Sequence, residues 1–382
     1  MFCYVAVEQR RRDARVPLIP ATADVLAKLG LKLHAPNGCG RESFYADEDY
    51  RASGVTLTDD HEGALRAADL VFRVGPPPKA DVAMMKRGAV HLSFLDPFGE
   101  QELIAAFAAA GVSAVSMEMI PRTTLAQKMD ALSSQASLAG YAAVIQAAAR
   151  LRLALPMRMT PAGTLLPARV GVIGAGVAGL QAIATAKRLG ARVEAFDTRP
   201  VVEEQVRSLG AKFVKIDLGE TGQTAGGYAQ ALTPEQIARQ QAGMAKVCAQ
   251  SNIVITTAKV FGRKAPRLVT APMLAGMRAG SVVVDLAIES GGNVEGARSG
   301  ADVVTSNGVT IIGDPCLEST VAHHASQVLA ANHAAWITHF WDESRRALRL
   351  DFADEILKGC LITHGGAIVH PKFVERPEPT TQ

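Results

Sequence analysis

The feature that most constrains this chain is a glycine-rich turn between two short apolar runs. Residues 170–173 form the first run, and the turn that follows has the sequence Gly174-Ala175-Gly176-Val177-Ala178-Gly179. A helix-forming segment then ends at Gly190, and the second run, residues 193–196, leads to Asp197. A strand, a glycine turn, a helix and a second strand ending in an acid about 20 residues after the turn are typical of a dinucleotide-binding βαβ unit.

The three glycines and the acid have separate physical roles in such a unit. The first glycine permits the tight turn, the second lets the backbone approach a pyrophosphate, and the third allows close contact of helix and strand. The N-terminus of the helix adds N–H donors and a positive dipole end. Asp197 is expected to accept hydrogen bonds from the adenosine ribose and to repel a 2′-phosphate, which favours NAD(H) over NADP(H). Arg199 would soften this preference, although we interpret it as a solvated loop charge.

Helix-like and strand-like segments alternate through the rest of the chain. This pattern predicts an α/β fold of two Rossmann-like parallel-sheet domains with a cleft between them. We place an N-terminal domain at residues 1–132, completed by the C-terminal segment 330–382, and a nucleotide-binding domain at residues 133–329. Two long helices, near residues 129–151 and 317–338, are predicted to join the domains. The first domain has no glycine fingerprint, so no nucleotide is expected there.

A second glycine-rich segment, residues 217–234, lies in the long connection after Asp197 and contains Gly227 and Tyr228. A loop of this length in a compact domain is usually functional or disordered. An aromatic residue near the tip of a glycine-hinged loop predicts a lid that closes on the cofactor. A surface insertion without a function is the alternative.

Composition excludes several classes of protein. The chain has 40 basic and 37 acidic residues, a balance that does not suggest a nucleic-acid-binding surface. Its five cysteines are scattered without a C-x-x-C pair, which excludes a disulfide framework, predicts no metal site and fits a reducing compartment. No apolar run reaches the ~20 residues that a membrane span needs, so we expect a soluble, cytoplasmic chain.

Segments spread over nearly the whole chain resemble one known family. They are Arg122–Gln135, with the sequence R-T-T-L-A-Q-K-M-D-A-L-S-S-Q, and Gly176–Ala191, Thr224–Ala229, Asp285–Asn293 and Gly366–Pro371. These segments are similar to the NAD(H)-binding domain I of proton-translocating nicotinamide nucleotide transhydrogenase. The length of the chain is similar to that of the soluble alpha-1 subunit of the three-subunit bacterial enzymes.

The resemblance implies an oxidoreductase that is catalytic only with partner subunits. In the family, domain I holds NAD(H) and passes a hydride directly to NADP(H) on domain III of a partner subunit. This Si-specific transfer is coupled to proton translocation through membrane-embedded subunits. The resemblance further implies a homodimer without nucleic-acid partners, which is peripheral to the inner membrane through its partners and does not insert into the membrane itself.

The fingerprint and the resemblance together assign the site residues. Those expected at the nicotinamide end and the facing nucleotide are Arg122, Gln127, Asp130, Ser133 and Tyr228. Those expected to bind NAD(H) are Gly174, Ala175, Gly176, Val177, Ala178, Gly179, Asp197, Thr198, Arg199, Gly227, Thr257 and Ala258. Hydride exchange between two nicotinamide rings needs positioning and no general base, which suits the amides, hydroxyls and charges of the first set.

Other functions remain open at this point. Alanine dehydrogenase, a relative in fold, needs a group that binds a carboxylate and side chains that handle protons. Arg15 matches the carboxylate-binding arginine of that enzyme. However, Arg73, Phe94 and Glu289 stand where it has a lysine, a histidine and an aspartate, and an arginine does not take up a proton near neutral pH. A non-catalytic NAD-binding paralogue is another alternative, and saccharopine-dehydrogenase-like relatives are more distant.

Overall fold

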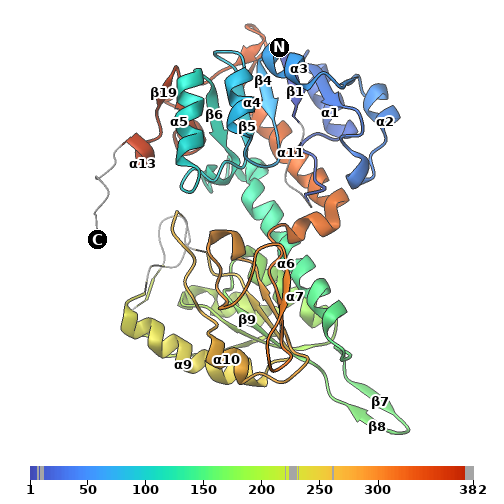
Figure 1. Ribbon diagram of the computed structural model, residues 1–382, viewed down its shortest axis with the longest axis vertical. Helices are drawn as coiled ribbons and strands as arrows, with labels where there is room; N and C mark the ends of the chain where they lie inside the picture. The colour runs from blue at the N-terminus through green and yellow to red at the C-terminus, as the bar shows by residue number, and fades with distance from the viewer. Residues whose placement is uncertain are drawn as a thin grey trace. The chain divides into compact units, whose positions relative to one another are not determined.

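The chain folds into two compact units, each built on a mainly parallel sheet (Figure 1). The computed structural model describes residues 1–6, 8, 13–219, 221–222, 230, 232–259 and 262–374. The first unit contains Met1–Gln135 and Val321–Gln382, and the second contains Ala136–Thr320. The predicted α/β class with two Rossmann-like sheets is therefore confirmed.

The sheet of the first unit has the strand order β19-β18-β6-β5-β4-β1-β2-β3. Its strands are β1 (Phe2–Val5), β2 (Lys32–Pro36), β3 (Thr56–Thr58), β4 (Leu70–Phe72), β5 (Val90–Ser93), β6 (Ser113–Ser116), β18 (Leu361–His364) and β19 (Ala367–Ile368). Strands β1 to β6 pair in parallel, whereas β18 pairs antiparallel with β6 and β19. The C-terminal segment thus returns to the first sheet, as the sequence predicts.

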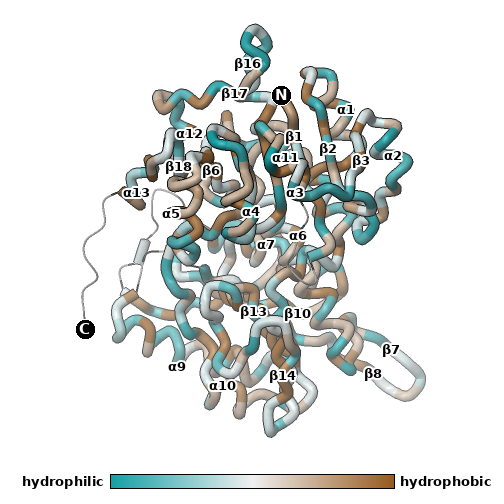
Figure 2. Tube along the Cα trace, turned by 45° about the horizontal axis from the view of Figure 1, so that its top comes forward, coloured by the Kyte–Doolittle hydropathy of each residue, from teal (hydrophilic) through white to brown (hydrophobic). Residues whose placement is uncertain are grey.

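The helices of the first unit connect and cover these strands. They are α1 (Pro20–Lys28), α2 (Asp47–Ala52), α3 (His61–Ala67), α4 (Lys79–Met84), α5 (Gln101–Ala110), α11 (Ala322–Phe340), α12 (Glu355–Cys360) and α13 (Pro371–Val374), with the 3-10 turns η1 (Arg41–Ser43), η2 (Met117–Met119) and η3 (Gln127–Met129). A small hairpin, β16 (Trp341–Asp342) and β17 (Ala347–Leu348), follows α11. Figure 2 shows hydrophobic stretches along strands such as β1 and hydrophilic ones on α2.

The sheet of the second unit has the order β11-β10-β9-β12-β13-β15-β14. Its strands are β9 (Arg169–Ile173), β10 (Arg192–Phe196), β11 (Lys212–Phe213), β12 (Ile253–Thr256), β13 (Val282–Asp285), β14 (Asp302–Val304) and β15 (Thr310–Ile312). Only the pairing of β14 with β15 is antiparallel among the described strands of this sheet. The strand order reverses at β9, between β10 and β12, which is the switch point where ligands of doubly wound sheets bind.

Two hydrophobic clusters cover the two faces of this second sheet. Along β12, Ile253 and Ile255 belong to one cluster and Val254 to the other. This alternation is the period-2 pattern of a strand buried on both faces. The helices are α6 (Ala131–Arg150), α7 (Val177–Arg188), α8 (Glu203–Ser208), α9 (Pro234–Gln250) and α10 (Ala271–Ala275), with the turns η4 (Pro200–Val202), η5 (Ile288–Ser290) and η6 (Leu317–Val321).

The second long helix differs from its prediction. Residues 317–321 form the 3-10 turn η6, and the α-helix α11 begins only at Ala322. Helix α11 packs on α1, η1 and η3 and belongs to the first unit, because its fully buried Trp336, Ile337 and Phe340 join that unit's core. The units therefore divide after Thr320, whereas we placed the boundary after residue 329.

A hairpin that the sequence did not predict extends from the second unit (Figure 1). It consists of β7 (Arg158–Thr160) and β8 (Gly163–Leu165), and all six of these residues are exposed. The two strands pair only with each other within the described part of the chain. Among the described residues, no helix combines the length and the apolar character that crossing a membrane requires.

Candidate functional site

The glycine turn lies at the switch point of the second sheet, directly after β9. Gly174 has a φ of +100°, and a Cβ atom there would collide with Oγ1 of Thr257. A Cβ atom on Gly179 would collide with the carbonyl oxygen of Gly174, so the start of α7 packs directly against the turn. By contrast, a Cβ atom on Gly176 would meet no described heavy atom within 4 Å. The first and third glycines are thus required by packing, and the second leaves space in front of the helix.

The first turn of α7 presents backbone donors at this point. The helix begins at Val177, and Leu180 N–H donates to the carbonyl of Gly176 over 2.8 Å. The N–H groups of Val177, Ala178 and Gly179 precede the first intrahelical donor, as in any helix start. Together with the positive end of the helix dipole, they suit a phosphate group.

Asp197 follows β10 and is tied to the glycine turn. Its Oδ2 accepts a hydrogen bond of 2.7 Å from the backbone N–H of Ala175. The Arg199 guanidinium donates to both carboxylate oxygens, from Nε over 2.9 Å and from Nη2 over 2.8 Å. Our interpretation of Arg199 as a solvated loop charge is therefore wrong, because its side chain is only 13% exposed and pairs with Asp197. The hydrogen bonds to Asp197 raise the pKa of Arg199 above its ordinary value.

The loop after β12 closes the other side of the switch point. Thr257 Oγ1 donates to the carbonyl of Gly174 over 3.0 Å, so this loop touches the glycine turn. The backbone of Ala258 is held by the side chain of Asn293, which accepts from Ala258 N–H over 3.1 Å and donates to Ala258 carbonyl over 2.9 Å. Asn293 is fully buried. Sequence reasoning assigned no role to Asn293 beyond its place in a resembling segment.

A buried carboxylate fixes the segment that carries Asn293. Asp285, at the end of β13, is fully buried and accepts from the N–H groups of Ala287 and Val294, each over 2.9 Å. Thr198 is anchored through its carbonyl, which accepts from Thr221 Oγ1 over 2.6 Å. The second unit thus brings together the glycine turn, Asp197, Arg199, Thr257 and Ala258. Gly227 and Tyr228, the predicted lid residues, lie outside the described residues.

The loop that contains Arg122, Gln127, Asp130 and Ser133 belongs to the first unit. Asp130 Oδ1 accepts from Ser133 N–H over 2.9 Å, in the manner of a helix N-cap at the start of α6. Gln127 lies on η3 and is exposed, and within the described part of the chain its side-chain amide makes no hydrogen bond. Arg122 is exposed as well. Gln127 is therefore available for an external partner.

Helix α11 holds this loop in place through one buried side chain. Asn332 donates to the carbonyl of Lys128 over 2.8 Å and accepts from Ser134 Oγ over 2.7 Å. These bonds join the turn η3 to the start of α6. Sequence reasoning missed Asn332, because its partners lie about 200 positions earlier in the chain.

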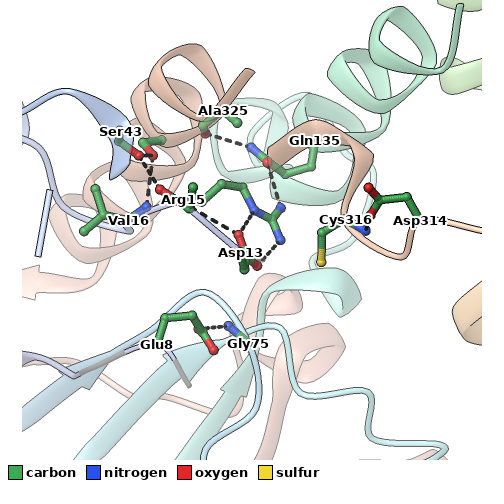
Figure 3. A network of polar contacts seen from close by, with 12 residues as sticks. Glu8, Asp13, Arg15, Val16, Ser43, Gly75, Gln135, Asp314, Cys316 and Ala325 are labelled. Carbon is green, nitrogen blue, oxygen red and sulfur yellow. Dashed lines mark hydrogen bonds and ion pairs between the residues drawn. The ribbon is translucent and has the colours of Figure 1, made fainter. Parts of the chain in front are cut away.

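The residues that align with alanine dehydrogenase side chains are occupied by internal partners (Figure 3). The Arg15 guanidinium donates to Asp13 from Nε over 2.8 Å and from Nη2 over 2.7 Å, and to Gln135 from Nη1 over 2.9 Å. Arg73 is fully buried and pairs with Asp81 over 2.7 Å. These contacts support the prediction that Arg15 has a structural role here.

A cavity of about 330 Å³ lies at the triple-proline loop of the first unit and is lined by Glu8, Pro76, Pro77, Pro78, Lys79, Glu100 and Leu103. Glu8 Oε2 accepts from Gly75 N–H over 2.9 Å and so bridges the segments after β1 and β4. Because these strands flank the switch point of the first sheet, the bridge takes the place that the glycine turn has in the second.

The two doubly wound sheets and the glycine turn define a Rossmann-type α/β protein. The chain belongs to the alanine dehydrogenase/PNT family, since the family model of the N-terminal domain matches residues 4–139 and that of the C-terminal domain matches residues 143–371.

Among its relatives, an NAD(P) transhydrogenase subunit alpha protein of Rhodospirillum rubrum is 41% identical over 376 residues, covering 96% of this chain and 98% of the relative. The protein of the same name from Rickettsia prowazekii is 39% identical over 378 residues, covering 98% and 97%.

Solved structures give the same picture. The crystal structure of transhydrogenase from Sinorhizobium meliloti matches with a TM-score of 0.83 and 40% identity, covering 97% of this chain and 100% of that one. An L-alanine dehydrogenase structure matches with a TM-score of 0.81 and 23% identity over 98% of both chains, which is a likeness in fold alone. The predicted resemblance to the transhydrogenase alpha subunit is thereby confirmed.

Proposed function

We propose that this chain is the NAD(H)-binding subunit of an NAD(P) transhydrogenase. The observation that carries the proposal is the switch-point site of the second unit, in a chain that matches the Rhodospirillum rubrum transhydrogenase subunit over 98% of that relative's length. In this proposal the N–H groups of Val177 and Ala178 bind the pyrophosphate and Asp197 binds the adenosine ribose. Thr257 and Ala258 form the opposite wall.

The cofactor, when bound, supplies the hydride, so the side chains of this protein have only to orient it. Gln127, Arg122 and Ser133 are assigned to the nicotinamide end, where an amide, a cation and a hydroxyl can fix the ring by hydrogen bonding. Asp130 acts through the start of α6, because its carboxylate holds the N–H of Ser133. Asn332 is a positioning residue for the same loop. None of these groups has to take up a proton.

The acceptor in this proposal is NADP(H), held on domain III of a partner subunit. Transfer is Si-specific and is coupled to proton translocation by membrane-embedded partners, so the chain works in the cytoplasm at the inner membrane. Partner dependence follows from the sites that we assign: one chain with one nucleotide site has no second nicotinamide to reduce.

Mixing the pieces tests the proposal. The isolated chain should bind NADH in a fluorescence titration and show almost no transhydrogenation alone. Adding a domain III protein loaded with NADP⁺ should produce stopped-flow hydride transfer from NADH. Binding without transfer would favour the non-catalytic NAD-binding module instead. Reduction of NAD⁺ by L-alanine would favour the amino-acid oxidoreductase, which the internal pairing of Arg15 and Arg73 argues against.

A further inference from the structure

The carboxylate of Asp197 is fully used within the protein. Oδ1 accepts from Arg199 N–H over 2.8 Å and from Arg199 Nε over 2.9 Å. Oδ2 accepts from Ala175 N–H over 2.7 Å and from Arg199 Nη2 over 2.8 Å. A carboxylate has about four lone-pair positions, so these four donors saturate it. A ribose that binds Asp197 must therefore replace one or more of them.

The four donors are not equally replaceable. The N–H groups of Ala175 and Arg199 belong to the backbone of the glycine turn and of the β10 loop, and they are fixed by the fold. The other two belong to one flexible side chain, and they place one donor on each carboxylate oxygen. The 2′- and 3′-hydroxyls of a ribose also present two O–H donors. The guanidinium of Arg199 thus holds the positions that the ribose needs.

The pair also changes the charge of the site. Asp197 and Arg199 have side chains only 6% and 13% exposed, so solvent screens their charges little. A lone carboxylate at this place would repel a 2′-phosphate, but the arginine beside it offsets that repulsion and is a good partner for phosphate. The acid alone therefore does not determine the choice between NAD(H) and NADP(H).

We infer that Arg199 is a specificity-determining residue of the switch-point site. It covers Asp197 in the free protein, is displaced by the adenosine ribose of NAD(H), and narrows the margin by which the site rejects NADP(H). This inference rests on the proposed function, because it requires that NAD(H) binds at Asp197. It assigns to Arg199 a role opposite to that of the acid next to it.

The test measures the ratio of the dissociation constants for NADPH and NADH in three variants. In Arg199→Gln the carboxylate keeps its charge and loses its cover, so the ratio should rise about tenfold or more, as expected for loss of one charge-assisted phosphate contact. Arg199→Lys keeps the positive charge, and its ratio should lie between those of the wild type and Arg199→Gln. Arg207→Gln is the matched control, because Arg207 pairs with Glu203 on an exposed part of α8 in the same unit.

The outcomes separate the inference from the proposed function. If the wild-type chain binds neither nucleotide, the proposed function and the inference are both wrong. If it binds NADH but the ratio in Arg199→Gln equals that of the wild type, the inference alone is overturned. The same holds if Arg207→Gln raises the ratio as much, since the effect would then be a general one of net charge. A thermal melt of each variant, with and without NADH, confirms that folded protein is compared, and Arg199→Lys still decides the matter if Arg199→Gln does not fold.

Discussion

Two residues that the resemblance assigns to the same loop differ in what surrounds them. Asp130 already caps the start of α6 through the N–H of Ser133, so part of its role is satisfied within the protein. Gln127 is exposed, and its amide makes no hydrogen bond to any described residue. A helix-start residue with a structural role would bond to backbone groups, as Asp130 does. The difference singles out Gln127 as the side chain that acts on something outside the chain.

Gln127→Asn tests this role at the scale of one methylene group. If Gln127 orients the nicotinamide, the shorter side chain should lower the rate of hydride transfer on the order of 10²-fold, as ~1 Å misplacements can. The affinity for NADH and the melting temperature should barely change, because the exposed amide has no described internal partner to lose. Stopped-flow transfer with a domain III partner and a thermal melt give the two readouts.

Gln101→Asn is the matched control for Gln127→Asn. Gln101 is also an exposed glutamine of the first unit, at the start of α5, so it should tolerate the same shortening without a change in transfer. A lower melting temperature with normal transfer in Gln127→Asn would show that Gln127 is structural.

At the scale of elements, the sequence predicts well what is local and buried. The spans of β12, β13 and α5 agree with the predicted segments, because apolar runs and helix formers there are bounded by clear stop signals. Strand β3 was missed, since its three residues, Thr-Leu-Thr, are too few to show a period.

The positioning residues of the candidate site were beyond sequence reasoning for a different reason. Asn293 and Asn332 act on backbone groups 35 and 204 positions away. No local pattern contains such a pair. The pairing of Arg199 with Asp197 is only two residues apart, but its burial comes from the surrounding fold, and so its interpretation as a solvated charge failed.

Helix α11 carries a buried imidazole that makes the first unit sensitive to acid. Burial lowers the pKa of His333 to about 4, and burial, with Arg73 and His333 nearby, lowers the pKa of His91 on β5 well below its usual value. In the unfolded chain a histidine has a pKa near 6.5, so the unfolded state binds more protons between about pH 6.5 and 4. The free energy of unfolding should therefore be highest above about pH 6.5 and fall as the pH drops towards 4.

His333→Gln should reduce this dependence on pH by removing one titrating group. The measurement is the free energy of unfolding in urea at pH 7.5 and at pH 5, and the difference between the two values should shrink by roughly 1–2 kcal/mol in the variant. A loss of packing would lower both values equally and leave the difference unchanged. His324→Gln, on an exposed position of the same helix, is the control. An unchanged difference in His333→Gln would contradict the assignment.

At the scale of the whole molecule, the β7–β8 hairpin has no described partner that accounts for its side chains. Met159 is 81% exposed, Leu165 54% and Leu166 80%, on a two-stranded ribbon that pairs with no other described strand. Isolated two-stranded hairpins are marginally stable in water, and exposed apolar patches commonly mark interfaces. We propose that a second copy of the chain covers this hairpin, in a homodimer of the kind that the resemblance implies.

Light scattering after size exclusion tests the homodimer directly. The wild-type chain should have a mass of about twice 40.2 kDa. The double variant Met159→Asp with Leu166→Asp should have the mass of one chain, since two charges in an apolar contact cost more than a modest interface supplies. NADH binding should persist in that variant, because the hairpin contributes no residue to the switch-point site. Val25→Asp, at an exposed apolar position on α1, controls for added charge and should leave the mass unchanged. A monomeric wild type, or a double variant that remains dimeric, would remove the hairpin from the interface.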